Sequence, residues 1–173
     1  SDVYKRQSIT RALTKYWEKD AEFYQKFSNI IKDYELASVK KGVKILVMPK
    51  TLESLAEFAS ICIATKQSFH IVAEILKILG LQDSIRAVVG RDSGYGPVKA
   101  VLYKKCVELC GGSKALIIDD NLEYLIDAYR HGYVPIYVAP NSYLAARSYR
   151  LGIPFGKPQK IADFLLRTLH EAM

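Results

Sequence analysis

Apolar and polar positions follow two different patterns along the chain. From about Ile9 to Leu36 the apolar residues recur at helical spacing, and one apolar stripe is predicted to consist of Phe23, Phe27, Ile30, Ile31 and Tyr34. After a polar break at 40–42, short apolar runs alternate with helical patterns. The chain is therefore predicted to have a helical amino-terminal segment and then a mixed domain.

The mixed domain is predicted to alternate helices and strands. The helices are expected at 51–60, 69–79, 97–110 and 122–131, and the strands at 61–64, 87–89, 116–118 and 134–138. Ser68 is the expected N-cap of the second helix, and Gly80 is its expected C-terminal glycine. Short connections of this kind join parallel strands by right-handed crossovers. The predicted fold class is α/β, with a three-layer Rossmann-like parallel sheet.

Three of the predicted strands are followed by polar residues suited to phosphate chemistry. Thr65 and Lys66 follow the first strand beside a helix N-terminus, where anions bind readily. Lys99 follows the second strand after a glycine-bearing loop, and Asp119 and Asp120 end the third. The carboxyl ends of parallel strands share one edge of a sheet, so these side chains are expected to meet.

Each of these residues also has an ordinary structural interpretation. Asp120 or Asn121 can cap the helix that follows, Thr65 can be a turn residue, and lysines such as Lys99 are usually solvated. Two adjacent carboxylates repel each other unless a cation compensates them, and hard oxygen ligands suit Mg²⁺. The order of all three motifs along one sheet edge favours a functional site.

Composition and charge exclude several classes of protein. The 173 residues are 50% hydrophobic and 25% charged, which fits one globular domain. No apolar run approaches the roughly 18 residues of a membrane span, so no membrane partner is expected. The net charge of +7 is spread along the chain without a recognition motif, so we expect an anionic small substrate and no nucleic acid. Three cysteines, Cys62, Cys106 and Cys110, are interpreted as reduced packing thiols of a cytoplasmic protein.

The order and spacing of the motifs over 43–138 resemble the haloacid dehalogenase (HAD) superfamily. Its phosphatases use a Ser or Thr at a strand end, then a lysine, then an acidic pair. Residues 61–65, Ile-Cys-Ile-Ala-Thr, resemble the second motif of the family. Residues 119–132, from the acidic pair to a closing glycine, resemble the fourth motif.

The resemblance implies a role for each candidate residue. Thr65, Lys99 and Asp120 would be catalytic, and Thr65, Lys66 and Lys99 would contact the phosphate. Asp119 and Asp120 would hold Mg²⁺. The implied protein is a Mg²⁺-dependent phosphatase that acts on a small phosphate ester through an aspartyl-phosphate intermediate. A metal-independent dehalogenase of the same fold and a non-catalytic binding fragment are the alternatives.

Two features depart from the family's pattern. The third-motif lysine of the family usually precedes a proline at the loop, where this chain has Tyr95, and Lys99 follows about one helical turn later. The first motif, Asp-x-Asp, supplies the nucleophile and the general acid/base, and it does not occur in residues 1–173. We expect it upstream of Ser1, so the chain as given is expected to be inactive.

Residues 1–7 are interpreted as a non-native segment, 8–42 as a partial helical cap and 43–173 as the HAD-like core.

The resemblance also implies a gap in the sheet. In the family's strand order, the first-motif strand lies between the strand that ends at Thr65 and the strand that ends at Asp119. Val43–Met48, either a short strand or an extended linker, is the one unassigned apolar run long enough to replace it. Unpaired interior backbone groups would cost roughly 1–3 kcal/mol each. We therefore expect the flanking strands to pair directly or the gap to be filled imperfectly.

Overall fold

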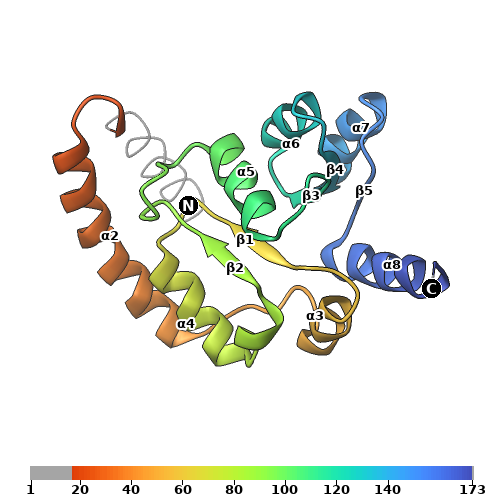
Figure 1. The fold of residues 1–173 in the computed structure, drawn as a ribbon, viewed down its shortest axis with the longest axis horizontal. Coiled ribbons are helices and arrows are strands. Elements are labelled where there is room, and N and C mark those ends of the chain that lie inside the picture. The colour runs from red at the N-terminus through yellow and green to blue at the C-terminus, as the bar shows by residue number, and fades with distance from the viewer. Residues whose placement is uncertain (1–16, 173) are drawn as a thin grey trace.

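The computed structural model describes residues 17–172, with the elements labelled in Figure 1. The helices are α2 (Ala21–Lys41), α3 (Pro49–Ala56), α4 (Phe69–Leu79), the 3₁₀ turn η1 (Gln82–Ser84), α5 (Lys99–Leu109), α6 (Leu122–Arg130), α7 (Ser142–Arg150) and α8 (Pro158–Glu171). The strands are β1 (Cys62–Ala64), β2 (Ala87–Val89), β3 (Leu116–Asp119), β4 (Val134–Val138) and β5 (Phe155–Gly156). The predicted non-native segment 1–7 and the predicted start of the cap at 8–16 lie outside the described residues.

All five strands run parallel to their neighbours, but they form two separate sheets. β1 pairs with β2, and β3, β4 and β5 form the second sheet in that order. Helix α5 contacts β1 and β2, α4 packs on β2, and α6 covers β3 and β4. The predicted α/β class with parallel strands and covering helices is confirmed. None of the described helices has both the length and the apolar content needed to cross a membrane.

A cavity of about 620 Å³ separates β1 from β3. The expected direct pairing of the flanking strands was wrong, because β1 and β3 belong to separate sheets. Val43–Met48 forms no strand and does not line this cavity, so the gap stays open among the described residues. The expectation that open strand edges would be too costly was wrong for this site. Leu116 and Ile118 of β3 are 49% and 45% exposed, so water can reach this strand and solvate its free backbone groups.

Helix α4 begins and ends where its sequence predicts. The Ser68 hydroxyl accepts a hydrogen bond from the His70 N–H at 3.3 Å, and Gly80 ends the helix with φ of 66°. Beside it, Gly90 leaves no room for a side chain, because a Cβ there would lie 2.7 Å from the Phe69 nitrogen. The loop after β2 can therefore approach the first turn of α4 closely.

Helix α2 packs on α4 through a face that differs from the predicted apolar stripe (Figure 1). Tyr24 and Ser28 are buried, whereas three members of the predicted stripe are exposed: Phe23, Ile30 and Tyr34. The cause is Arg91, whose side chain is only 3% exposed and lies under α2. Its guanidinium donates to the Ser28 hydroxyl at 2.8 Å and to the Glu35 carboxylate at 3.0 Å. A buried guanidinium needs such acceptors, so it turns a polar face of α2 inward.

The cysteines correct another expectation. Cys62 on β1 and Cys110 at the end of α5 form a disulfide, so they are not both reduced packing thiols. Their sequence separation of 48 residues gave no sign that α5 lies over β1. Cys106 is free and buried, and burial raises its pKa to about 11.

Candidate active site

Lys99 links the carboxyl ends of the two sheets. Its Nζ donates to the Ala64 carbonyl oxygen at the end of β1, at 2.8 Å, and to Asp119 Oδ2 at the end of β3, also at 2.8 Å. The Lys99 and Asp119 side chains are only 14% and 8% exposed, which favours a tight ion pair. The structure therefore brings together the ends of β1 and β3 and the lysine that follows β2.

Tyr103 is a second donor to the same carboxylate oxygen. Its hydroxyl donates to Asp119 Oδ2 at 2.6 Å, and the Asn121 N–H donates to Asp119 Oδ1 at 2.9 Å. Burial and the nearby Asp119 charge raise the pKa of the Tyr103 hydroxyl, which keeps it protonated as a donor. Tyr103 was not among the site residues predicted from the sequence. The available signal was its position four residues after Lys99, on the same face of α5.

The two adjacent carboxylates have opposite electrostatic environments. Burial alone would raise the pKa of Asp119, but the Lys99 ammonium and the hydrogen bonds from Lys99, Tyr103 and Asn121 hold it below its ordinary value. Burial and the neighbouring Asp119 charge raise the pKa of Asp120. The Asp120 carboxyl is partly desolvated although the residue as a whole is exposed, and it has no salt bridge among residues 17–172. The Asp119 oxygens are therefore already engaged by hydrogen bonds, whereas the Asp120 oxygens are more available to bind a ligand.

Asn121, and not Asp120, caps helix α6. The Asn121 Oδ1 accepts from the Glu123 N–H at 3.1 Å and from the Tyr124 N–H at 3.3 Å. The structural alternative, in which Asp120 or Asn121 caps the helix, is therefore fulfilled by Asn121. The Asp120 carboxylate is left outside the cap.

Thr65 and Lys66 lie on the loop that leaves β1. The Thr65 hydroxyl oxygen accepts from the Gln67 N–H at 3.0 Å, so its own proton stays available for an acceptor. Lys66 Nζ lies 4.7 Å from the centroid of the Tyr124 ring, and Lys99 Nζ lies 6.0 Å from the same centroid. Tyr124 therefore brings two ammonium groups close to one aromatic ring, and it was not among the residues predicted from the sequence.

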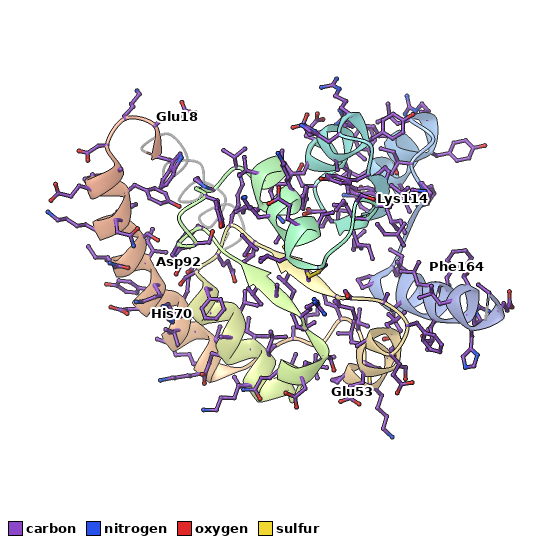
Figure 2. The ribbon with its side chains drawn as sticks, viewed as in Figure 1. Glu18, Glu53, His70, Asp92, Lys114 and Phe164 are labelled. Carbon is purple, nitrogen blue, oxygen red and sulfur yellow. A yellow bond between two sulfur atoms is a disulfide. The ribbon has the colours of Figure 1, made fainter. Side chains whose placement is uncertain are left out.

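The loop after β2 is fixed on the far side of this site. Asp92 accepts from the Ser68 hydroxyl at 2.5 Å and from the Phe69 N–H at 2.8 Å. Figure 2 shows Asp92 and His70 close together on the side of the molecule where α2 lies. These hydrogen bonds hold the pKa of Asp92 below its ordinary value, although burial alone would raise it. Asp92 is therefore a structural carboxylate of the α4 N-terminus.

The donor chemistry of the acidic pair fits a Mg²⁺ ion. Asp119 and Asp120 provide hard oxygen atoms, and Mg²⁺ usually takes one or two carboxylates together with water and phosphate oxygens. Among the described residues there is no group of three or more His, Cys, Asp or Glu side chains placed to hold a metal. Since Lys99 and Tyr103 occupy Asp119 Oδ2, Asp120 is the better placed of the two ligands.

Comparison with known proteins supports the fold of this chain and nothing finer. No family model and no curated protein matches the chain. A solved structure that matches is a hydrolase of the haloacid dehalogenase-like family from Streptococcus pneumoniae, with a TM-score of 0.54 and 18% sequence identity. The match covers 66% of this chain and 56% of that chain, so the protein spans little more than half the length of this neighbour. The chain therefore has a haloacid dehalogenase-like fold.

Proposed function

We propose that this sheet edge binds the phosphate group of a small phosphorylated substrate together with Mg²⁺, as part of a phosphatase of the HAD-like fold. The observation that carries the proposal is Lys99, a largely buried cation held between the ends of β1 and β3 and paired with one of two adjacent carboxylates. An ammonium and carboxylates on one strand edge suit a phosphate and a divalent ion, because each balances the other's charge.

Three side chains of this chain would bind the phosphate together. Lys66 and Lys99 would oppose the negative charge of the phosphoryl oxygens, and the Thr65 hydroxyl would donate a hydrogen bond to one of them. Tyr124 would keep the two ammonium groups near each other, since both lie against its ring. Charge-assisted contacts of this kind are stronger than neutral ones.

Asp120 would be the main protein ligand of the metal, with Asp119 beside it. Bound Mg²⁺ would polarise the phosphoryl oxygens and stabilise the charge that develops on them. Tyr103 and Lys99 would act as positioning residues that keep the Asp119 carboxylate in one orientation. An aspartyl-phosphate reaction also needs an Asp-x-Asp nucleophile motif, and residues 1–173 contain none. We therefore expect this chain to bind phosphate and metal without turnover.

Isothermal titration calorimetry on the 173-residue chain tests this proposal. Lys66→Met is expected to weaken phosphate binding by about 10- to 150-fold, since a lost charge-assisted contact is worth about 1.5–3 kcal/mol. Asp120→Asn is expected to weaken Mg²⁺ binding measured in the presence of phosphate. The matched controls are Lys26→Met and Asp127→Asn, exposed residues outside the site. Equal loss in the controls, or full binding by both site variants, would contradict the proposal.

Calorimetry separates the first alternative from the proposal, and an activity measurement separates the second. A metal-independent dehalogenase would show no Mg²⁺ binding that depends on Asp120. A non-catalytic binding fragment would bind phosphate and Mg²⁺ as proposed and would remain inactive after an Asp-x-Asp strand is supplied. Recovery of phosphatase activity in that last experiment would favour the enzyme.

A further inference from the structure

Arg91 connects helix α2 to the loop that leaves β1. A guanidinium carries five N–H donors, and Arg91 uses all five of them. Two donate to Ser28, to its hydroxyl at 2.8 Å and to its carbonyl oxygen at 3.2 Å. Two more donate to the Glu35 carboxylate, at 3.0 and 3.3 Å, as a bidentate pair. The fifth donates to the Lys66 carbonyl oxygen at 3.5 Å, so one side chain contacts both α2 and a candidate phosphate-binding residue.

The backbone around Arg91 holds the same loop. The Arg91 N–H donates to the Gln67 carbonyl oxygen at 3.0 Å, and the Thr65 N–H donates to the Val89 carbonyl oxygen at 3.0 Å. A Cβ at Gly90 would lie 2.8 Å from the Gln67 carbonyl oxygen, so the two segments are in direct contact. A shift of Arg91 would therefore move the 65–67 loop, which carries two of the candidate phosphate-binding side chains.

The position of the Arg91 side chain depends in turn on α2. This side chain is only 3% exposed, and four of its five hydrogen bonds go to Ser28 and Glu35. A buried charge without partners is strongly unfavourable, so detachment of α2 would let the guanidinium move toward water and away from the Lys66 carbonyl. Attachment of α2 thus fixes Arg91, and Arg91 fixes the 65–67 loop.

We propose that Arg91 is a positioning residue of the phosphate site, held in place by α2, and that α2 attachment and phosphate binding stabilise each other. The coupling is mutual because both favour the same position of the 65–67 loop. All five Arg91 donors are engaged, so Arg91 acts through the loop and not as a phosphate ligand. This inference rests on the proposed function, because it concerns how Thr65 and Lys66 are presented to the phosphate.

Glu35→Gln tests the proposal by calorimetry with inorganic phosphate on the 173-residue chain. We expect phosphate binding to weaken about fivefold, the low end of the usual range for coupled sites. A purely electrostatic effect has the opposite sign, because removing a negative charge would strengthen the binding of an anion. Glu22→Gln is the matched control, since Glu22 is an exposed carboxylate on the same helix, and it should leave phosphate binding unchanged.

Hydrogen exchange tests the reciprocal effect. Saturating phosphate should slow exchange of the α2 amides by a factor similar to the loss of affinity in Glu35→Gln, because coupling between two sites is reciprocal. Exchange in α8 should change little, and Lys66→Met should abolish the effect on α2. Arg91→Lys keeps the charge but lacks the planar fork, so it should also weaken phosphate binding. A purely structural role of Arg91 would not make α2 respond to phosphate.

Two outcomes would overturn the inference. The first is unchanged or tighter phosphate binding by Glu35→Gln, with α5 and α6 exchanging as in the wild type. The second is no slowing of α2 exchange at saturating phosphate. If the wild type binds phosphate and Lys66→Met does not, either outcome removes this inference and leaves the proposed function standing. A wild type that binds no phosphate would end both.

Discussion

Asp119 is the residue on which the other polar groups of the site converge. Both of its oxygens accept hydrogen bonds, from Lys99 and Tyr103 on one side and from the Asn121 N–H on the other. Asp120, one residue later, is exposed and lies outside the helix cap. The sequence could identify the acidic pair, but it could not distinguish the two members, because their difference arises from side chains on α5.

Tyr103→Phe removes one of the three donors to Asp119 and changes little else. We expect the free energy of unfolding at pH 7 to fall by about 1.5–3 kcal/mol, the usual value of a hydrogen bond to a charged group. Urea denaturation measures the difference. Tyr129→Phe is the matched control, since Tyr129 is exposed on α6, and it should change stability by less than about 0.5 kcal/mol.

The effect of Tyr103→Phe should also depend on pH in a defined direction. The pKa of folded Asp119 lies below the ordinary value of an aspartate, because Lys99 and the hydrogen bonds favour the ionised form, so these contacts stabilise the folded protein above that ordinary pKa. The stabilisation is lost as the pH falls through the folded pKa. The difference between wild type and Tyr103→Phe should therefore shrink in acid. A difference that stays constant or grows below pH 4 would contradict the assigned hydrogen bond.

At the scale of elements, helix α2 is attached to the rest of the molecule largely by polar contacts. Arg91 also accepts a hydrogen bond through its carbonyl, from the Tyr24 hydroxyl at 3.3 Å. Burial raises the pKa of that hydroxyl to about 12, although the nearby Arg91 charge lowers it. The apolar residues on the outer face of α2 take little part in this attachment.

Arg91→Met should therefore loosen α2 while leaving the two sheets folded. Breaking a buried ion pair costs about 3–5 kcal/mol, and we expect the lower end because Glu35 is partly exposed and can be hydrated. Hydrogen exchange should accelerate in α2 and stay slow in α5 and α6. Arg130→Met is the control, since its contact with Asp127 is exposed. Uniform acceleration across all helices would mean that Arg91 stabilises the whole domain instead.

Local sequence patterns, such as helix-end residues and apolar runs, predicted most of the helices and strands of the core. Ser68 and Gly80 mark the ends of α4, and the apolar run before Asp119 is the predicted strand β3. The buried face of α2 was not predictable, because Arg91 lies 56 residues from its partner Glu35. The elements after Val138 were also not predicted, namely α7, β5 and α8. Strand β5 has only two residues, too few to show an alternation.

At the scale of the whole molecule, the site depends on two sheets that do not pair with each other. Lys99 spans the gap at its carboxyl end, and the Cys62–Cys110 disulfide joins β1 to α5. The parallel direction of the strands was enough to predict that the motifs share one edge. The separation between β1 and β3 depends on long-range packing of α3, α5 and α8, which no local pattern reports.

The most direct test of the site is the broadening of backbone amide NMR signals by Mn²⁺, a paramagnetic substitute for Mg²⁺, in the presence of phosphate. If the sheet edge is one site, Mn²⁺ should broaden the amides of Thr65 and Lys66 together with those of Asp119, Asp120 and Asn121. Excess Mg²⁺ should restore the signals, and Asp120→Asn should weaken the effect. Broadening centred on exposed acids such as Glu108 or Asp127, with Thr65 and Lys66 unaffected, would contradict a shared phosphate and metal site.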